Sequence, residues 1–290
     1  MKPPPFEYHA VGSVDEAVAL LAEHGDEAKV LAGGQSLVPL LALRLARPAH
    51  VIDINGVGDL AAVANGAGLA IGALVRHRVA ERSAAVRAAN PLVADALGLI
   101  GHVAIRNRGT IGGSIAHADP AAELPAVLLA LGGDVEVTSR RGSRRVGASD
   151  LFVGFLTTSI APDELLTGVG FPAWTARTGW SFQEFSRRSG DFAVAGVAAT
   201  VRLDGNGTIG EARIALSGVA SVPVRAVAAE AALVGQAPSE ELWAAASEDA
   251  ATGLEPPSDV HGSAAYRRHL ASVLIRRALR EATERAEVRS

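Results

Sequence analysis

The spacing of hydrophobic residues predicts alternating short helices and strands in the first half of the chain. Apolar residues recur at helical intervals from Val14 to Leu21, and Ser13 and Glu16 form a capping-box pair in front of them. Gly25 is placed to end this helix. Three short apolar runs then predict strands, at Lys29–Ala32, Val51–Ile54 and Leu69–Ala73. We therefore expect a mixed α and β arrangement with short connections.

The pattern continues up to a stretch without periodicity. It predicts a helix at Val86–Leu99, a glycine-rich segment at Gly109–Ser114, a helix at Leu124–Leu131 and a strand at Val135–Thr138. The following stretch, Phe171–Gly179, has turn-forming residues and no clear period. We place a domain boundary there, which gives a first domain at 1–176, with subdomains at about 1–56 and 57–176, and a second domain at 177–290.

The second half predicts a small antiparallel sheet backed by helices. Val197–Leu203 and Ile209–Leu216 alternate apolar and polar residues on either side of the turn at Asp204–Gly207, as expected for a β-hairpin. Helical patterns cover Arg225–Val234 and Tyr266–Glu287. The fold class we expect is therefore α+β.

Composition narrows the possible functions. The chain has 290 residues, 49% hydrophobic and 20% charged, which is typical of a folded globular protein. A net charge of -4 argues against nucleic acid or an anionic membrane as the main partner. The sequence has neither a signal-peptide pattern nor an apolar run long enough for a transmembrane segment, so we expect a cytoplasmic protein.

Cysteine and histidine usage bears on redox chemistry. The chain contains no cysteine, which excludes disulfides, thiolate zinc sites and iron–sulfur clusters held by cysteine. The eight histidines include no pair at a helical metal spacing such as H-E-x-x-H, so we expect no metal site. Any redox chemistry in this chain would then need an organic cofactor.

Two glycine-rich segments are the main candidates for a binding site. Ala32–Ser36 follows a predicted strand, where glycine lets backbone N–H groups approach an anion and Ser36 can cap the next helix. Thr110–Ser114 offers the same chemistry. Neither segment matches G-x-G-x-x-G or the P-loop. A single segment of this kind is more often only a tight turn. The two segments together are equally consistent with a site for a phosphate-containing ligand and with two tight turns. Asp119 and Glu123 could accept hydrogen bonds from ligand hydroxyls, or could serve only at a helix N-terminus.

Four stretches in the same order resemble a known family. They are AGGQSLVPLLALRLARPAHVIDI (Ala32–Ile54), IRNRGTIGGSIAHADPAAELPA (Ile105–Ala126), RRSGDFA (Arg187–Ala193) and GSAAYRRHLASVLIRRAL (Gly262–Leu279). The chain resembles the FAD-binding medium subunits of molybdenum hydroxylases, the xanthine dehydrogenase family, and most closely those of aerobic carbon monoxide dehydrogenase and its relatives. The resemblance extends from about Phe6 to Leu279.

The resemblance implies a fold like that of vanillyl-alcohol oxidase and p-cresol methylhydroxylase. Two α/β subdomains would hold FAD noncovalently, and a C-terminal domain would contain a three-stranded antiparallel sheet and helices. The two glycine-rich segments would surround the pyrophosphate and ribityl chain, Asp119 and Glu123 would lie near the ribityl hydroxyls, Leu165 and Leu166 near the adenine, and Arg187, Asp191 and Phe192 near the isoalloxazine ring. The implied cofactor-binding residues are Ala32, Gly33, Gly34, Gln35, Ser36, Leu37, Thr110, Ile111, Gly112, Gly113, Ser114, Asp119, Glu123, Leu165, Leu166, Arg187, Asp191 and Phe192.

The sequence departs from the family pattern at several of these positions. Glu123 stands where many relatives have Asp, and Gln35 and Ser114 stand where close relatives have His and Asn; all three can still form hydrogen bonds. Phe192 stands where the carbon monoxide enzyme has Tyr, so a hydroxyl beside the flavin is missing. The external electron acceptor and the reactivity toward oxygen therefore stay open. Arg187 could instead belong to a solvated or subunit-facing surface.

The resemblance also implies a role within a complex. Substrate would be oxidised at a molybdenum cofactor in a large subunit, and electrons would cross two [2Fe-2S] clusters in a small subunit to the FAD and then to an external acceptor. The chain would need no catalytic acid–base residue, and the complex would be a dimer of heterotrimers, cytoplasmic or attached to the inner face of the membrane through the complex. Two alternatives remain: a self-contained FAD-dependent oxidase or reductase of the same fold superfamily, and a non-catalytic scaffold in which the glycine-rich segments are only turns.

Overall fold

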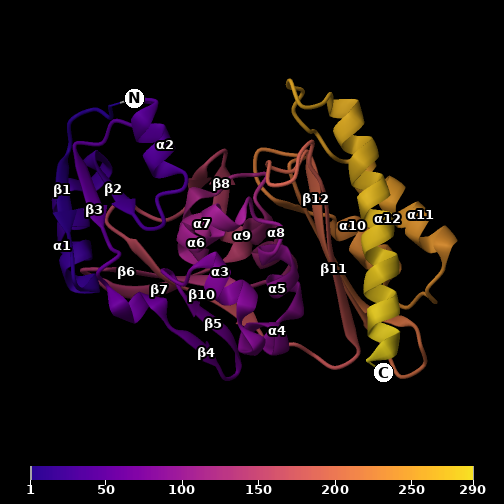
Figure 1. Cartoon of the computed structure of the whole chain (residues 1–290). Coiled ribbons are helices and arrows are strands. Elements are labelled where there is room, and N and C mark those ends of the chain that lie inside the picture. The colour runs from indigo at the N-terminus through magenta and orange to yellow at the C-terminus, as the bar shows by residue number, and fades with distance from the viewer. Residues whose placement is uncertain (1, 290) are drawn as a thin grey trace.

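The computed structural model describes residues 2–289 and consists of three main sheets with helices between and beside them (Figure 1). The first sheet is parallel, the second is a larger antiparallel sheet, and the third is the antiparallel sheet of the C-terminal part. A two-stranded ribbon, β8 (Phe152–Gly154) with β9 (Thr157–Thr158), completes the strands described. Among residues 2–289, no helix is both long and apolar enough to cross a membrane.

The N-terminal sheet has the strand order β1-β3-β2, and all neighbouring pairs are parallel. The capping pair acts as expected in part: Ser13 Oγ accepts from Glu16 N, whereas the Glu16 carboxylate accepts from Gly12 N. Gly25, at φ +50°, ends the helix. The bounds are β1 Glu7–Ala10, α1 Val14–His24, η1 Gly25–Glu27, β2 Ala28–Leu31, α2 Leu37–Ala42, β3 His50–Asp53 and η2 Gly58–Ala61.

The middle part contains a five-stranded antiparallel sheet in the order β4-β5-β10-β6-β7. Its strands are β4 Val63–Asn65, β5 Gly68–Gly72, β6 Asp134–Ser139, β7 Gly142–Gly147 and β10 Leu165–Pro172. Its helices are α3 His77–Arg82, α4 Ala84–Ala89, α5 Pro91–Leu97, α6 Val103–Arg108, α7 Ile111–His117, α8 Glu123–Leu131 and α9 Ala148–Leu151. Apolar side chains of the sheet and helices form one core.

Two sequence predictions in this part are wrong in detail. The single helix expected at Val86–Leu99 is interrupted, because Pro91 lacks the N–H that a helix interior requires and instead begins α5. Asn90 caps α5 by accepting from Val93 N. The second glycine-rich segment is not a loop beyond Thr110: Gly112, Gly113 and Ser114 all lie in α7.

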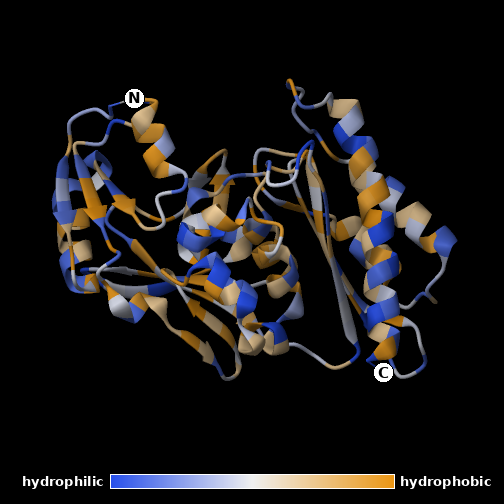
Figure 2. Ribbon diagram, viewed as in Figure 1, coloured by the Kyte–Doolittle hydropathy of each residue, from blue (hydrophilic) through white to orange (hydrophobic). Residues whose placement is uncertain are grey.

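The C-terminal part has a four-stranded antiparallel sheet in the order β11-β12-β13-β14, one short strand more than the resemblance implies. The predicted hairpin is confirmed as β12 and β13. Helix α12 covers one face of this sheet, and its hydrophobic and hydrophilic residues alternate along its length (Figures 1 and 2). The bounds are β11 Thr178–Phe185, β12 Ala195–Leu203, β13 Ile209–Ser217, β14 Val224–Arg225, α10 Val227–Leu233, α11 Glu240–Thr252 and α12 Ala264–Val288.

The other face of the C-terminal sheet packs against the middle part. Phe182, Ala198 and Ala215 belong to the same buried cluster as Leu124 and Leu128 of α8. The sheet is therefore held between α12 on one side and the middle helices on the other, and this arrangement fixes the loop between β11 and β12 beside the middle part.

Candidate functional site

The two glycine-rich segments lie directly against each other. A Cβ atom at Gly33 would overlap the carbonyl oxygen of Arg108 and lie 2.8 Å from Gly109 Cα, so only glycine allows the two backbones to approach this closely. Gly34 has φ +74°, a left-handed conformation that glycine adopts without strain. The two segments therefore meet at one place in the molecule.

A chain of hydrogen bonds links the same two segments. Asn55 Nδ2 donates to Ala32 O over 2.9 Å, and Arg76 Nη2 donates to Asn55 Oδ1 over 2.6 Å. Arg76 Nη1 donates to Arg108 O at 2.5 Å. The guanidinium group therefore joins the end of the first sheet to the end of α6, directly before the second glycine-rich segment. Asn55 and Arg76 could not be predicted from the sequence, because each bonds to backbone far from it in the chain.

A cavity of about 680 Å³ opens between these segments, within the usual range for ligand and cofactor sites. Its wall includes the first segment from Ala32 to Leu37, and Leu165, Leu166, Asp191 and Phe192 from later parts of the chain. From the second segment and the following turn it includes Thr110, Gly112, Gly113, Ser114, Asp119 and Glu123. All predicted site residues except Ile111 and Arg187 therefore line one cavity.

The second segment is held by contacts behind the cavity wall. Thr110 caps α7, its Oγ1 accepting from Gly113 N at 3.1 Å. A Cβ at Gly112 would lie 2.7 Å from Ala73 Cα, so this glycine is required for packing against the end of β5. Ile111 is fully buried in the core behind the segment, which explains why it does not reach the cavity.

His77 holds the second segment through a hydrogen bond to its backbone. Its Nε2 lies 2.8 Å from Thr110 O, and burial lowers the pKa of the imidazole to about 4. The ring is therefore neutral near pH 7, and Nε2 carries the proton that it donates to the carbonyl. His77 acts as a fixed donor that holds Thr110 in place.

The first segment differs from expectation at Ser36. This residue occupies the N-cap position of α2, but its backbone is already helical and its side chain makes no capping hydrogen bond. Gln35 Nε2 donates to Gly33 O at 3.1 Å. The prediction that Ser36 caps the helix is wrong, and its hydroxyl lies in the cavity wall instead.

Two residues with carboxyl groups, Asp119 and Glu123, line the cavity after the second segment. Asp119 Oδ1 accepts from Ala121 N at 2.9 Å, so it stabilises a turn and not the N-terminus of α8, which begins at Glu123. Glu123 is only 6% exposed, and burial, with the nearby Glu184 as the next cause, raises the pKa of its carboxyl group to about 8. At pH 7 Glu123 is therefore largely protonated and can donate as well as accept a hydrogen bond.

One end of the cavity is formed by the start of β10. Leu165 and Leu166 are buried apolar residues there, and Glu164 beside them is paired with Arg144 at 2.7 Å. That pairing holds the pKa of the Glu164 carboxyl below its usual range. Sequence analysis missed further wall residues at this end because nothing in their local sequence distinguishes them; they are Leu156, Thr158, Ile160, Ala161, Pro162 and Glu164.

The loop between β11 and β12 forms the other end. Gly190, at φ +86°, packs so closely on His102 that a Cβ would lie 2.6 Å from the imidazole Nδ1. Phe192 is 61% exposed although it lies in the cavity wall. Arg187 is outside the wall and donates from Nη1 to Val260 O at 3.3 Å. The structure therefore brings Asp191 and Phe192 to the cavity and Arg187 to the segment before α12.

A cavity of this size, walled by glycine-rich backbone, carboxyl groups and apolar side chains in an α+β fold, is typical of a protein that binds a nucleotide cofactor. The chain belongs to the family of FAD-binding subunits of molybdopterin dehydrogenases. The family model described as "FAD binding domain in molybdopterin dehydrogenase" matches residues 4–174. The model described as "CO dehydrogenase flavoprotein C-terminal domain" matches residues 180–282. The expected fold class, family and FAD cofactor are confirmed.

Individual proteins resemble the chain over nearly its whole length. It is 45% identical to the 6-hydroxypseudooxynicotine dehydrogenase complex subunit alpha of Paenarthrobacter nicotinovorans, over 99% of this chain and 97% of that protein. It is 40% identical to the carbon monoxide dehydrogenase medium chain of Hydrogenophaga pseudoflava, over 98% of this chain and 99% of the relative. A solved structure of carbon monoxide dehydrogenase from Hydrogenophaga pseudoflava, which lacks the Mo-pyranopterin moiety of the molybdenum cofactor, superposes with a TM-score of 0.96 at 43% identity, covering 98% of this chain and 99% of that one.

The residues of the cavity fit FAD. Close backbone packing at Gly33 and Gly112 leaves room for a diphosphate beside the polar side chains of Ser36 and Ser114. The Glu123 carboxyl group makes no hydrogen bond to another of the described side chains and is available to a hydroxyl. The chain is therefore an oxidoreductase subunit with a site of suitable chemistry for this cofactor.

Proposed function

We propose that the chain is the FAD-carrying electron-transfer subunit of a heteromeric molybdenum-dependent dehydrogenase. It would receive electrons from iron–sulfur clusters of a partner subunit and pass them to an external acceptor. The observation that carries the proposal is the single cavity walled by both glycine-rich segments and by the loop at Asp191 and Phe192. Such a cavity suits one extended dinucleotide and no separate organic substrate.

The composition supports the proposal that different subunits carry different cofactors. The chain has no cysteine, so it cannot hold iron–sulfur clusters through thiolates, and these would reside in another chain. The printed names of its relatives describe a subunit of a dehydrogenase complex and a medium chain. We therefore propose a large molybdenum-cofactor subunit and a small iron–sulfur subunit as partners, in a dimer of heterotrimers.

We assign the cavity residues to parts of FAD as follows. Ala32–Ser36 and Thr110–Ser114 would hold the pyrophosphate and the start of the ribityl chain. Asp119 and Glu123 would bind ribityl hydroxyls. The apolar end at Leu165 and Leu166 suits the adenine, and the opposite end at Asp191 and Phe192 suits the isoalloxazine ring; Leu37 would contribute apolar wall. Ile111 and Arg187 would act only from outside the site.

The chain's own residues would bind and orient the cofactor. FAD supplies the redox chemistry when bound. His77 would keep Thr110 in position through its neutral, donating imidazole. Arg76 would keep the two glycine-rich segments together. No side chain of this subunit is required to act on the organic substrate.

The test is to tag this chain in its native host and recover the complex that forms on it. We expect flavin and iron–sulfur absorption together, with molybdenum by elemental analysis, because this chain cannot supply the last two. Flavin absorption from a single purified chain with its own substrate turnover would instead establish a self-contained flavoenzyme. A colourless product that takes up no added FAD would contradict the proposal and would indicate a non-catalytic scaffold.

A further inference from the structure

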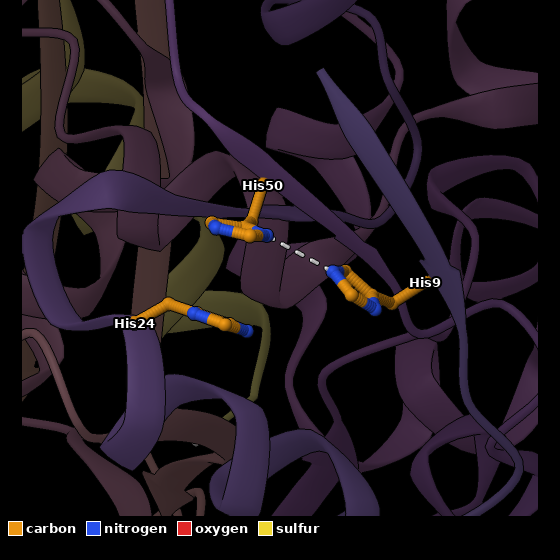
Figure 3. A group of neighbouring side chains, drawn as sticks. All are labelled: His9, His24 and His50. Atoms are coloured by element: carbon orange, nitrogen blue, oxygen red, sulfur yellow. Dashed lines mark hydrogen bonds between the residues drawn. The ribbon is translucent and has the colours of Figure 1, made fainter.

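A cluster of three histidines lies outside the FAD cavity, on the N-terminal sheet. His9 is in β1, His50 begins β3 and His24 ends α1 (Figure 3). None of the three belongs to the cavity wall. One ring nitrogen from each lies within 4.8 Å of the others. The function proposed above does not use this group.

The fold explains why these residues meet. Strands β1 and β3 are parallel neighbours, and Glu7 in β1 is paired in register with His50. Glu7 and His9 lie two residues apart on one strand and therefore share a face of the sheet. Helix α1 runs back along that sheet after β1, which returns its last residue, His24, to the edge where the strands begin.

The ring nitrogens of His9 and His50 lie close together, and the Glu7 carboxylate lies beside them. His9 Nε2 and His50 Nδ1 are 3.1 Å apart. Each carboxylate oxygen of Glu7 approaches one of these nitrogens: Oε2 lies 3.6 Å from His50 Nδ1, and Oε1 lies 3.9 Å from His9 Nε2. Four ligands at zinc distances of about 2.0–2.2 Å in a tetrahedron are separated from one another by about 3.3–3.6 Å, close to these spacings.

The third histidine must change its ring orientation to join these two in binding an ion. The rings of His24 and His50 are stacked, with centroids 3.6 Å apart and planes at 9°. An ion bound by both imidazoles must lie near both ring planes, so the two rings have to turn relative to each other about their Cβ–Cγ bonds. The side chains of His9 and His50 are mostly buried and that of Glu7 is exposed, which leaves an opening from solvent.

We propose that His9, His24, His50 and Glu7 bind one divalent transition-metal ion, with Zn²⁺ as the preferred occupant. Imidazole nitrogen with one carboxylate and no thiolate is a ligand set suited to this class of metal, and Zn²⁺ accepts the four-coordinate geometry. The bound ion fastens the end of α1 to the start of β1 and β3. The sequence gives no local signal for this site, because its ligands come from three elements and have no helical spacing.

The test uses the full-length FAD-loaded chain with any affinity tag removed, after stripping with a chelator. Equilibrium dialysis against Zn²⁺ followed by elemental analysis is expected to give one tightly bound zinc per chain. His24→Ala and His50→Ala are each expected to bind zinc at least tenfold more weakly. The matched control is His269→Ala, an exposed histidine of α12, which should bind as the unchanged chain does. Equal flavin content in all variants verifies their folding.

Two further readouts distinguish a built site from loose surface binding. Zn²⁺ is expected to raise the Tm of the unchanged chain and of His269→Ala, but not that of the other two variants. Co²⁺ in place of Zn²⁺ should give the intense visible absorption of a tetrahedral site. Zinc binding of equal strength in His24→Ala, His50→Ala and the unchanged chain would overturn the proposal, as would the absence of stoichiometric binding.

Discussion

Gly33 and Gly112 are required for contacts within the protein itself. Each would place a Cβ against backbone, at Arg108 and Gly109 in one case and at Ala73 in the other. Gly33→Ala and Gly112→Ala should therefore lower the free energy of unfolding by about 1–3 kcal/mol and greatly reduce FAD retention. In Gly33→Ala the two segments must move apart, and in Gly112→Ala the second segment must move away from Ala73 at the end of β5. Flavin content after gel filtration and denaturant unfolding measure both effects.

The control for these variants is Gly66→Ala, where an added Cβ meets no atom within 4 Å. It should retain FAD normally. Full flavin content in both Gly33→Ala and Gly112→Ala would contradict the assignment of the pyrophosphate to the junction between the segments.

Phe192 is exposed in the cavity wall, where the flavin ring is proposed to lie. Phe192→Ala should leave FAD bound, since the diphosphate contacts are remote from it, and should change the rate of flavin reoxidation several-fold. Stopped-flow reoxidation of the reduced complex measures this rate. The control is Phe155→Ala, at another exposed phenylalanine that is not in the cavity wall. Equal reoxidation rates in the unchanged chain and both variants would contradict a position of Phe192 beside the flavin ring.

Glu123 makes stability depend on pH. Burial raises the pKa of its carboxyl group to about 8 in the folded chain, against an ordinary value of 4.5, so the folded state holds the proton more tightly than the unfolded state. This contribution is present below pH 4.5 and is lost as the pH rises toward about 8. Between pH 5 and pH 9, the free energy of unfolding of the FAD-free unchanged chain should fall by an amount on the order of 1–3 kcal/mol because of Glu123. This decrease should be absent in Glu123→Gln.

Denaturant unfolding at a series of pH values measures the difference. The exposed Glu255→Gln serves as the control and should follow the unchanged chain. Burial also raises the pKa of the Glu184 carboxyl to about 7, so part of the loss should persist in Glu123→Gln. A variant with the same pH dependence as the unchanged chain would show that Glu123 is ionised in the fold.

Residues of the cavity wall could be predicted from the sequence where they share a short segment. They could not be predicted where burial or the direction of the side chain decides whether a residue reaches the wall. The two glycine-rich segments were found because glycine between a strand and a helix is a local signal. Ile111 lies in one of them but turns into the core, and Arg187 lies beside Asp191 but turns toward Val260. Direction depends on neighbours from other parts of the chain, which a local pattern does not contain.

At the scale of elements, long periodic segments were predicted and interrupted ones were not. The hairpin of β12 and β13 and the helix α12 follow from their clear periods. Helix α11 was missed because its many alanines give weak amphipathic contrast. Helix α7 was missed because its glycines disfavour a helix in isolation, and its packing on β5 and the cap at Thr110 override that preference.

Arg76 forms hydrogen bonds that link the residues after β3 to the end of α6. Its guanidinium group bonds to Asn55 and to the Arg108 carbonyl, across the two glycine-rich segments. Arg76→Met should raise the Kd for FAD about tenfold, which corresponds to about 1.4 kcal/mol, because the cavity wall loses this link. Fluorescence titration of the FAD-free chain measures the Kd. Arg87→Met, which breaks an exposed ion pair with Asp95, is the control, and equal affinity in both variants would contradict the role of Arg76.

At the scale of the whole molecule, the C-terminal sheet completes the core of the middle part. Phe182, Ala198 and Ala215 are buried together with the α8 side chains. A chain ended at residue 176 should therefore expose this surface, bind a hydrophobic dye and fail to retain FAD. Dye fluorescence and flavin content compared with the full chain test this, and normal FAD retention by the fragment would show that the loop at Asp191 and Phe192 is dispensable.

The wall of the cavity extends in sequence from Leu21 to Phe192. During synthesis on the ribosome, the glycine-rich segments emerge long before the residues that close the far end. The loop at Phe192 is then fixed only when β12 has paired on both sides and α12, the last helix, has covered the sheet. We therefore expect the cavity to be complete only after α12 has been synthesised and packed, so that FAD binds after translation.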